Sequence, residues 1–217
     1  MARRCVGVLA IIAALGTAVT PAGARSARSD ASVTAIVPTV AVRDRGAVEF
    51  ADVSKTKPVG VGAEVRTGTH GLAQVDYGDG SFTRLDRQTK FVIKKLTDKT
   101  GKRQIETHLI SGKTFNRVEK LSQSESFVQT TNGANSGVIG TTFAVAWTGK
   151  TQTSTYTLLK GTLILRARGQ KKPVRLTAGQ RVTIVKGVPG PVETLTPQEL
   201  CVDPWICSNT GNTGYAQ

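Results

Sequence analysis

Hydrophobic and polar residues alternate along most of the chain with a period of two, the pattern of β-strands with one buried face. Residues 73–77 alternate in this way, and residues 81–85 alternate again after Gly78-Asp79-Gly80. An Asp-Gly pair accepts the positive φ angles of a tight turn, so these two segments predict a β-hairpin.

The same pattern predicts more strands farther along the chain. They are rich in β-branched or aromatic residues, and they lie at 91–93, 127–128, 143–147, 163–168 and 181–185. Gly112, Gly161 and Gly179 each precede such a strand, as expected where a wrapped sheet turns a tight corner. No window keeps a helical period. The prediction is an all-β domain over residues 33–185, a β-helix-like or sandwich-like wrap of short antiparallel strands.

The C-terminal part has a different composition. Residues 186–195 contain Pro189, Gly190 and Pro191 and are predicted to form a linker. Thr196-Pro197-Gln198-Glu199 is typical of a capping box, which predicts one short C-terminal helix around 198–202. Residues 208–217, rich in Asn, Thr and Gly, are predicted to form a mobile tail.

The N-terminus is predicted to be a signal peptide over residues 1–24. Arg3 and Arg4 precede an apolar run at 5–19, and Ala22-Gly23-Ala24 supplies small residues for cleavage. Cleavage after Ala27 and an uncleaved membrane anchor are the alternatives. The mature chain has no apolar run long enough to span a membrane. The protein is therefore expected to be exported, either periplasmic or secreted.

The chain is strongly basic, and export changes what this implies. Losing Arg3 and Arg4 lowers the formal net charge from +14 to +12. An exported protein of this charge meets envelope polyanions rather than a chromosome, and 5% aromatic residues give little surface for stacking nucleic-acid bases. The expected partner is an envelope protein or an anionic cell-wall polymer, and nucleic acid is disfavoured.

Two groups of basic residues could bind an anion. The first basic cluster comprises Lys90, Lys94, Lys95, Lys99, Lys102 and Arg103, and the second comprises Arg166, Arg168, Lys171, Lys172 and Arg175. The anion-binding residues predicted from them are Lys90, Lys94, Lys95, Arg166, Arg168, Lys171 and Lys172. The alternative is that these cations keep a β-protein soluble and discourage pairing at sheet edges.

Cys201 and Cys207 remain after the signal peptide is removed, an even pair in an oxidising compartment. They predict a disulfide that fastens the C-terminal tail. No histidine lies near this pair in the sequence, and two thiolates are too few for structural zinc, so no metal site is predicted.

The sequence contains no recognisable catalytic constellation. His70 and His108 lie far apart without a ligand pattern, and both are expected to be structural or solvated. Asp76 and Asp79 fit a strand and a turn better than a pair of catalytic acids. Nucleophile-elbow, phosphate-loop and dinucleotide motifs are missing from the sequence. The prediction is a non-enzymatic protein without a cofactor.

Between residues 62 and 185 the order of motifs resembles the FecR-type domain of iron-dicitrate sensor regulators and their exported relatives. The matching segments are 63–68, 71–81, 109–113, 137–145, 159–163 and 176–180. The residues carried over as family motif, with an expected structural role, are Asp79, Gly80, Gly140 and Thr141. The family's usual Arg before the Gly-Thr pair is replaced by Ile139. A partner contact made by that Arg would be lost in this chain.

The resemblance implies a β-helix-like wrap without catalysis or cofactor. In the sensor family, this domain relays the state of an outer-membrane receptor to a cytoplasmic sigma factor, through a membrane helix and a cytoplasmic segment that precede it. Only the predicted signal peptide and a short polar stretch precede the first strand here. We therefore expect a freestanding envelope interaction module for binding or signalling. The alternative is a basic protein that binds cell-wall polyanions or glycans.

Overall fold

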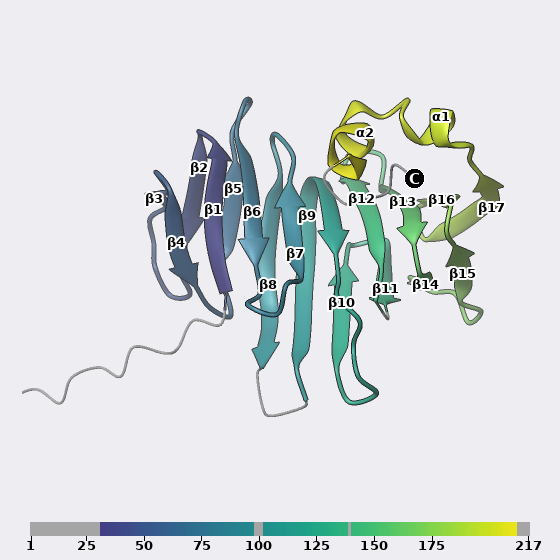
Figure 1. The fold of residues 1–217 in the computed structure, drawn as a ribbon, viewed down its shortest axis with the longest axis horizontal. Helices are drawn as coiled ribbons and strands as arrows, with labels where there is room; N and C mark the ends of the chain where they lie inside the picture. Colours follow the sequence, from purple (N-terminus) through teal and green to yellow (C-terminus); the bar gives the residue numbers. More distant parts are fainter. Residues whose placement is uncertain (1–30, 98–101, 139, 212–217) are drawn as a thin grey trace, which may run out of the picture.

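The computed structural model describes residues 31–97, 102–138 and 140–211, and in this part 17 strands build two packed β-sheets (Figure 1). The molecule is elongated, and the strands follow one another along its long axis from the N-terminal to the C-terminal end (Figure 1). The predicted signal peptide, Lys99 and Ile139 lie outside the described residues.

The first sheet, sheet A, has the strand order β4 (Thr56–Val59), β1 (Ala31–Val37), β6 (Leu72–Asp76), β7 (Phe82–Leu85), β9 (Gln104–Arg117), β12 (Thr142–Thr148), β13 (Thr153–Lys160), β16 (Gln180–Val185) and β17 (Val188–Thr194). All of its neighbouring strands are antiparallel, and they include the predicted hairpin of β6 and β7.

The second sheet, sheet B, has the order β3 (Ala51–Asp52), β2 (Val40–Arg43), β5 (Glu64–Thr67), β8 (Lys90–Thr97), β9, β10 (Ser126–Thr130), β11 (Ala134–Val138), β14 (Thr162–Ala167) and β15 (Val174–Thr177). Its one parallel pair joins β10 to β9. The all-β, sandwich-like prediction is confirmed.

Strand β9 belongs to both sheets. Its first part, up to Ser111, pairs with β8 and β10 in sheet B, and its second part, from Gly112, pairs with β7 and β12 in sheet A. Gly112 makes the corner with a φ of +98°, a conformation that residues with a Cβ rarely adopt. Thr89 packs against this corner, and its Oγ1 accepts a hydrogen bond from the Lys113 N–H at 3.1 Å. β9 thus connects the two layers covalently.

The core lies between the sheets and combines apolar packing with a buried hydrogen-bond network. Phe127 packs edge-on between Tyr77 and Phe143, with ring centroids 5.8 and 6.4 Å apart. Asn116 lies beside these rings and is fully buried. Such a network fixes the register of the strands that supply it, because each polar group needs its own partner.

The buried network joins side chains of three strands, β7, β9 and β10, to Tyr77, which follows β6. The Thr83 hydroxyl donates to Asn116 Oδ1 at 2.8 Å, and it lies 2.9 Å from the Tyr77 hydroxyl. Asn116 Nδ2 donates to Gln129 Oε1 at 2.7 Å, and Gln129 Nε2 donates to Thr114 Oγ1 at 2.9 Å. β7, β9 and β10 therefore meet through side chains as well as through backbone pairing.

Stability should fall at alkaline pH because of two buried tyrosines. Burial raises the pKa of Tyr156 to about 12 and raises that of Tyr77 still further. An unfolded tyrosine ionises near pH 10. Above that pH the unfolded state binds fewer protons than the folded state, so unfolding becomes easier. We expect the free energy of unfolding to fall steadily between about pH 10 and pH 12.

Urea denaturation at pH 8, 10 and 11.5 measures this loss. Tyr156→Phe removes one of the two titrating groups and should flatten the decline, although it also removes the hydrogen bond to Ala134 O. A stability that stays constant up to pH 11.5 would contradict the buried placement of both hydroxyls.

The C-terminal part differs from the prediction in three places. The predicted linker contains β17, which pairs with β16. Its prolines are tolerated because β17 is an edge strand that needs N–H donors on one side only. The structure has two short helices in place of one, namely α1 (Pro197–Leu200) and α2 (Pro204–Thr210). The start of the predicted mobile tail belongs to α2, and residues 212–217 lie outside the described residues.

The two helices have clear N-terminal signals. The Thr196 capping box is present as predicted, because its side chain accepts from the Glu199 N–H and the Glu199 carboxylate accepts from the Thr196 N–H. Asp203 caps α2 by accepting from the Trp205 N–H at 3.0 Å. Within the described residues, no helix is long and apolar enough to cross a membrane.

Candidate functional site

The Asp79-Gly80 motif forms the turn between β6 and β7. Asp79 Oδ1 accepts a hydrogen bond from the Ser81 N–H at 2.8 Å, and Gly80 has a φ of +89°. A Cβ on Gly80 would lie 3.2 Å from the side chain of Glu119. These contacts place the turn against the segment that follows β9, which is a structural arrangement.

The Gly140-Thr141 motif lies against the same segment. Thr141 exchanges two backbone hydrogen bonds with Val118, at 2.8 and 3.0 Å. Gly140 has a φ of +59°, and a Cβ on it would lie 3.1 Å from the Cα of Lys120. Gly80, Gly140 and Thr141 thus lie against residues 118–120, while Asp79 hydrogen-bonds within the β6–β7 turn. The structural role of these four residues stays a prediction, and this geometry is compatible with it.

Members of both predicted basic clusters lie on the outer face of sheet B, but apart from one another. Lys90, Lys94 and Lys95 are exposed on β8, and Arg166 is exposed on β14. Four strand spacings separate β8 from β14, which corresponds to roughly 19 Å. The cations form a broad strip rather than one compact site.

Other members of the clusters leave this strip. Arg168, Lys171 and Lys172 are exposed in the turn between β14 and β15. Arg103 is buried, and its Nε lies 3.6 Å from Asp79 Oδ2. The prediction placed Arg103 in a surface cluster because its position in the sequence does not show that its side chain is buried.

His108 lies on the face of sheet B between the two clusters. Its Nδ1 is 2.8 Å from Thr130 Oγ1. Burial first and Lys94 second lower the pKa of His108, while Glu106 acts in the opposite direction. The imidazole therefore stays neutral at pH 7 and adds no charge to the strip. His70 is exposed in the turn that connects β5 to β6.

A cleft that the sequence did not predict opens at one end of the sandwich. We call it the end cleft; its volume is about 520 Å³. It is lined by Asn132, Gly133, Trp147, Gly149, Gln152, Arg168, Lys186 and Gly187. These residues come from four turns that connect β10 to β11, β12 to β13, β14 to β15 and β16 to β17, together with the end of β12. Arg168 is the member of the predicted anion-binding set that reaches it.

Backbone hydrogen bonds connect the turns around the end cleft. The Arg168 N–H donates to Gly133 O at 2.9 Å, and the Lys186 N–H donates to Gln152 O at 2.8 Å. The sequence signal that could have found this site is Lys186-Gly187, a two-residue hairpin turn. Nothing in the sequence shows that this turn meets the other three.

Comparison with known families gives one match: residues 63–164 match the family described as FecR protein. Residues 63–164 match a FecR domain. The match extends from the residue before β5 into β14, and it includes all four motif residues, so the resemblance noted in the sequence is confirmed. A comparison with curated proteins gave no match.

The fold is shared with solved structures. Two crystal structures of a candidate anti-sigma factor from Parabacteroides distasonis ATCC 8503 match with TM-scores of 0.54 and 0.55 and sequence identities of 17% and 16%. Each match covers 66% of this chain and 64% or 63% of the other, so it spans less than two thirds of those proteins. At this identity, the likeness shows a common fold for the FecR domain.

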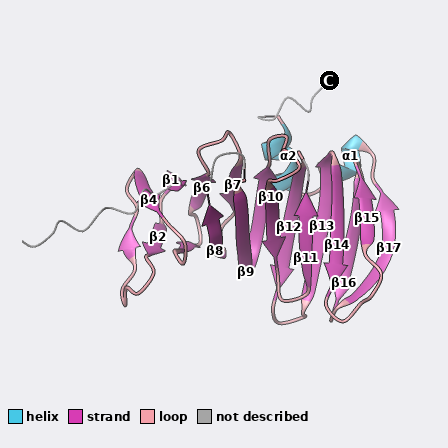
Figure 2. Ribbon diagram, turned by 90° about the horizontal axis from the view of Figure 1, so that it is seen from below, coloured by secondary structure: helices cyan, strands magenta, loops and turns pink. Residues whose placement is uncertain are grey.

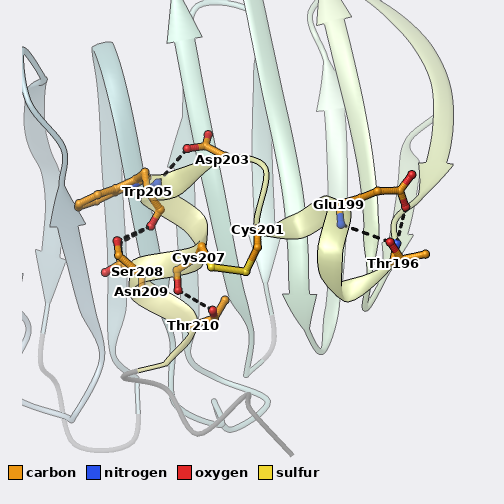
Figure 3. Close-up of a disulfide and its surroundings, with 9 residues drawn as sticks. All are labelled: Thr196, Glu199, Cys201, Asp203, Trp205, Cys207, Ser208, Asn209 and Thr210. Carbon is orange, nitrogen blue, oxygen red and sulfur yellow. Dashed lines mark hydrogen bonds between the residues drawn. A yellow bond between two sulfur atoms is a disulfide. The ribbon is translucent and has the colours of Figure 1, made fainter.

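A C-terminal cap, defined here as residues 196–210, packs on the outer face of sheet A beside the FecR domain. The predicted disulfide joins Cys201 to Cys207, with 4.4 Å between their Cα atoms (Figure 3). Ile206 of α2 is buried in a small cluster with Phe115, Ala144 and Leu159. Both helices lie beside the C-terminal half of the sandwich (Figure 2).

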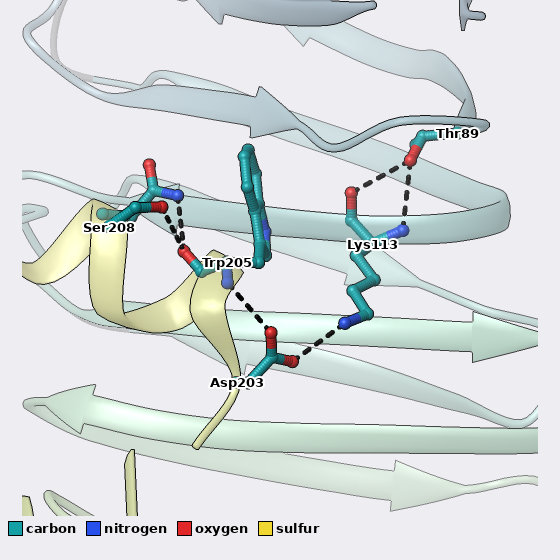
Figure 4. Close-up of polar contacts among 6 residues, drawn as sticks. Thr89, Lys113, Asp203, Trp205 and Ser208 are labelled. Carbon is teal, nitrogen blue, oxygen red and sulfur yellow. Dashed lines mark hydrogen bonds and ion pairs between the residues drawn. The ribbon is translucent and has the colours of Figure 1, made fainter. Parts of the chain in front are cut away.

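Polar contacts hold the C-terminal cap in register with β9. Lys113 Nζ lies 2.9 Å from Asp203 Oδ2, while the other oxygen of Asp203 caps α2 (Figure 4). Arg84 Nη1 donates to Asn209 Oδ1 at 3.0 Å. Lys113 is thus tied at its backbone to Thr89, next to the Gly112 corner, and at its side chain to the cap (Figure 4).

Removing the disulfide should loosen the C-terminal cap and leave the two sheets folded. The bridge closes a loop of only six residues in sequence separation, so its loss should cost about 2 kcal/mol of local stability. In a Cys201→Ser, Cys207→Ser variant, amide hydrogen exchange should accelerate at 203–210 and stay unchanged in β9. Val202→Ala is the matched control because Val202 is 78% exposed. Unchanged exchange in α2 would show that packing alone holds the cap.

Proposed function

We propose that this chain is a non-enzymatic, exported interaction module of the cell envelope, built on a FecR domain. The observation that carries the proposal is the FecR match over residues 63–164. Membership of this family supports a signalling or regulatory role, and such a role requires contact with another protein. The fold shared with a candidate anti-sigma factor is compatible with that role.

The proposed module exposes two different faces. The C-terminal cap covers part of sheet A, whereas no helix of the described residues packs on the outer face of sheet B. An envelope protein is the proposed partner, and the uncovered face of sheet B is the surface proposed to contact it. Family motif residues are engaged in turns, so the partner contact is proposed to use other residues.

Photo-crosslinking in living cells tests this proposal. A photoreactive residue placed at Arg166 probes sheet B, and one placed at Val202 probes the C-terminal cap; both positions are exposed. We expect crosslinks to envelope proteins and a mature N-terminus after Ala24 or Ala27. Recovery of a chain that still begins at Met1, crosslinked only to cytoplasmic proteins, would refute the proposal.

The basic strip on sheet B favours a second candidate function, binding of a cell-wall polyanion or glycan. Lys90, Lys94 and Arg166 are exposed on the same face, and attraction to a polyanion would be screened by salt. Purified cell wall should retain the protein at low ionic strength and release it at high ionic strength.

Charge-matched variants make this test specific. Changing Lys90, Lys94 and Arg166 to glutamine should abolish retention. The control changes Lys55, Lys120 and Lys160, which are exposed elsewhere, and loses the same total charge. Equal losses in both variants, or retention that ignores salt, would refute a specific site on sheet B.

A further inference from the structure

The end cleft lies at the opposite end of the strands from the FecR motif. Strand β12 begins beside the motif at Thr142 and ends at Thr148, next to the cleft. Its volume of about 520 Å³ is within the usual range of small-molecule sites, roughly 300–1,000 Å³. The cleft is therefore large enough for a ligand and independent of the turns that define the family.

The charges around the end cleft favour an anion. Arg168 and Lys186 contribute two cations to its lining, and the residues that line it include no Asp or Glu. Neither cation forms an ion pair with another residue of the described chain. Two unpaired cations that face one cleft attract a carboxylate or a similar group.

The remaining lining residues favour a ligand rich in hydroxyl groups. Asn132 and Gln152 are exposed amides, each able to donate and accept hydrogen bonds. Trp147 is 4% exposed, and its buried indole N–H has no acceptor among the described residues. Gly133 lies over the indole edge, because a Cβ there would be 3.0 Å from Trp147 Cζ3. Amide and cationic groups together suit a charged sugar.

The turns that carry these groups are held in unusual conformations. Gln152 and Lys186 have φ angles of +50° and +51°, the left-handed region that non-glycine residues rarely adopt. They are joined by the hydrogen bond from the Lys186 N–H to Gln152 O. Such conformations persist where the surrounding structure fixes them, and they cluster at ligand sites. The two turns are thus fixed relative to one another before any ligand binds.

We propose that the end cleft binds a carboxylate-bearing saccharide. Arg168 and Lys186 hold its carboxylate, and the amides of Asn132 and Gln152 hydrogen-bond its hydroxyls. This site is separate from the protein-interaction role proposed above and does not depend on it. The ligand class follows from the lining alone, and it fits either a free sugar acid or the end of an acidic glycan.

Titration of the purified protein with digalacturonic acid, followed by ¹⁵N NMR, tests the proposal. The amide signals of Gly133, Gly149 and Gly187 and the indole N–H signal of Trp147 should shift with a saturable dependence on concentration. Trp205→Phe assigns the indole signal, since the chain has two tryptophans. Maltose, a neutral disaccharide of similar size, should leave these signals unchanged.

Two variants separate the site from general charge attraction. Lys186→Asn removes a cation and keeps the turn, because Asn is favoured where φ is positive in such a hairpin. It and Arg168→Gln should each weaken binding about tenfold, the effect of losing a charge-assisted hydrogen bond. A control with Lys90 and Lys94 changed to glutamine loses two charges on the distant face and should bind normally.

The outcomes are distinct. Saturable binding that both cleft variants weaken and the control retains supports the proposal. Absence of shifts at millimolar digalacturonic acid, equal binding of maltose, or equal weakening in the control would overturn it. Displacement of the sugar by an equal concentration of inorganic phosphate would also overturn it, because the site would then be one for simple anions.

Discussion

Replacing Asn116 with leucine should lower the free energy of unfolding by about 3 kcal/mol, although the two side chains have the same number and branching of heavy atoms. The change removes the donor and the acceptor at the centre of the buried network. Thr83 loses the oxygen to which its hydroxyl donates, and Gln129 Oε1 loses a donor at 2.7 Å. Each buried polar group left without a partner costs about 1–3 kcal/mol. Urea denaturation of the purified protein measures the loss.

Two further variants show whether the network itself is responsible. Asn135→Leu makes the same substitution on an exposed position of β11 and should change stability by less than about 0.5 kcal/mol. Adding Thr83→Val and Tyr77→Phe to Asn116→Leu removes the orphaned Thr83 hydroxyl together with the Tyr77 hydroxyl that pairs with it, and should restore part of the loss. If Asn116→Leu lowers the free energy of unfolding by less than about 1 kcal/mol, the hydrogen bonds of Asn116 do not stabilise the core as predicted.

The features that sequence predicts well here depend on neighbouring residues. The β6–β7 hairpin follows from alternation on both sides of an Asp-Gly turn, and both are local. The Thr196 capping box and the Cys201–Cys207 bridge likewise need only a few residues of context. The order of the motifs also made the FecR resemblance recognisable, because six weak local patterns that occur in one order are specific when taken together.

The features that escaped prediction depend on distant residues. The sequence predicts a tight corner at Gly112, but it does not show that one strand continues through this corner and serves two sheets. The end cleft combines turns from 132 to 187, each unremarkable alone. The prolines of β17 suggested a linker because the sequence does not show that this strand is at an edge. α2 consists of weak helix formers and is held by its cap, its disulfide and Ile206.

Replacing Gly112 with alanine should have the largest effect of any single change considered, a loss of about 4 kcal/mol. The residue would have to adopt a φ of +98°, which costs an L-residue about 1–2 kcal/mol. Its Cβ would also lie 2.7 Å from the Cα of Thr89 and would overlap the Thr89 hydroxyl. Since the Cα belongs to the backbone, no side-chain rotation relieves the contact. The crossing of β9 between the sheets must shift.

Gly169→Ala separates the two causes of this loss. Gly169 has a φ of +80°, but a Cβ there would have no atom within 4 Å, so only the conformational cost of about 1 kcal/mol remains. The difference in unfolding free energy between the two variants therefore measures the steric cost of a Cβ at the Gly112 corner. Because Lys113 follows Gly112 and binds Asp203, the Gly112 variant should also loosen α2, visible as faster amide exchange at 203–210. Equal losses at Gly112 and Gly169, with α2 unchanged, would mean that Thr89 can move aside and that the corner of β9 is not tightly packed.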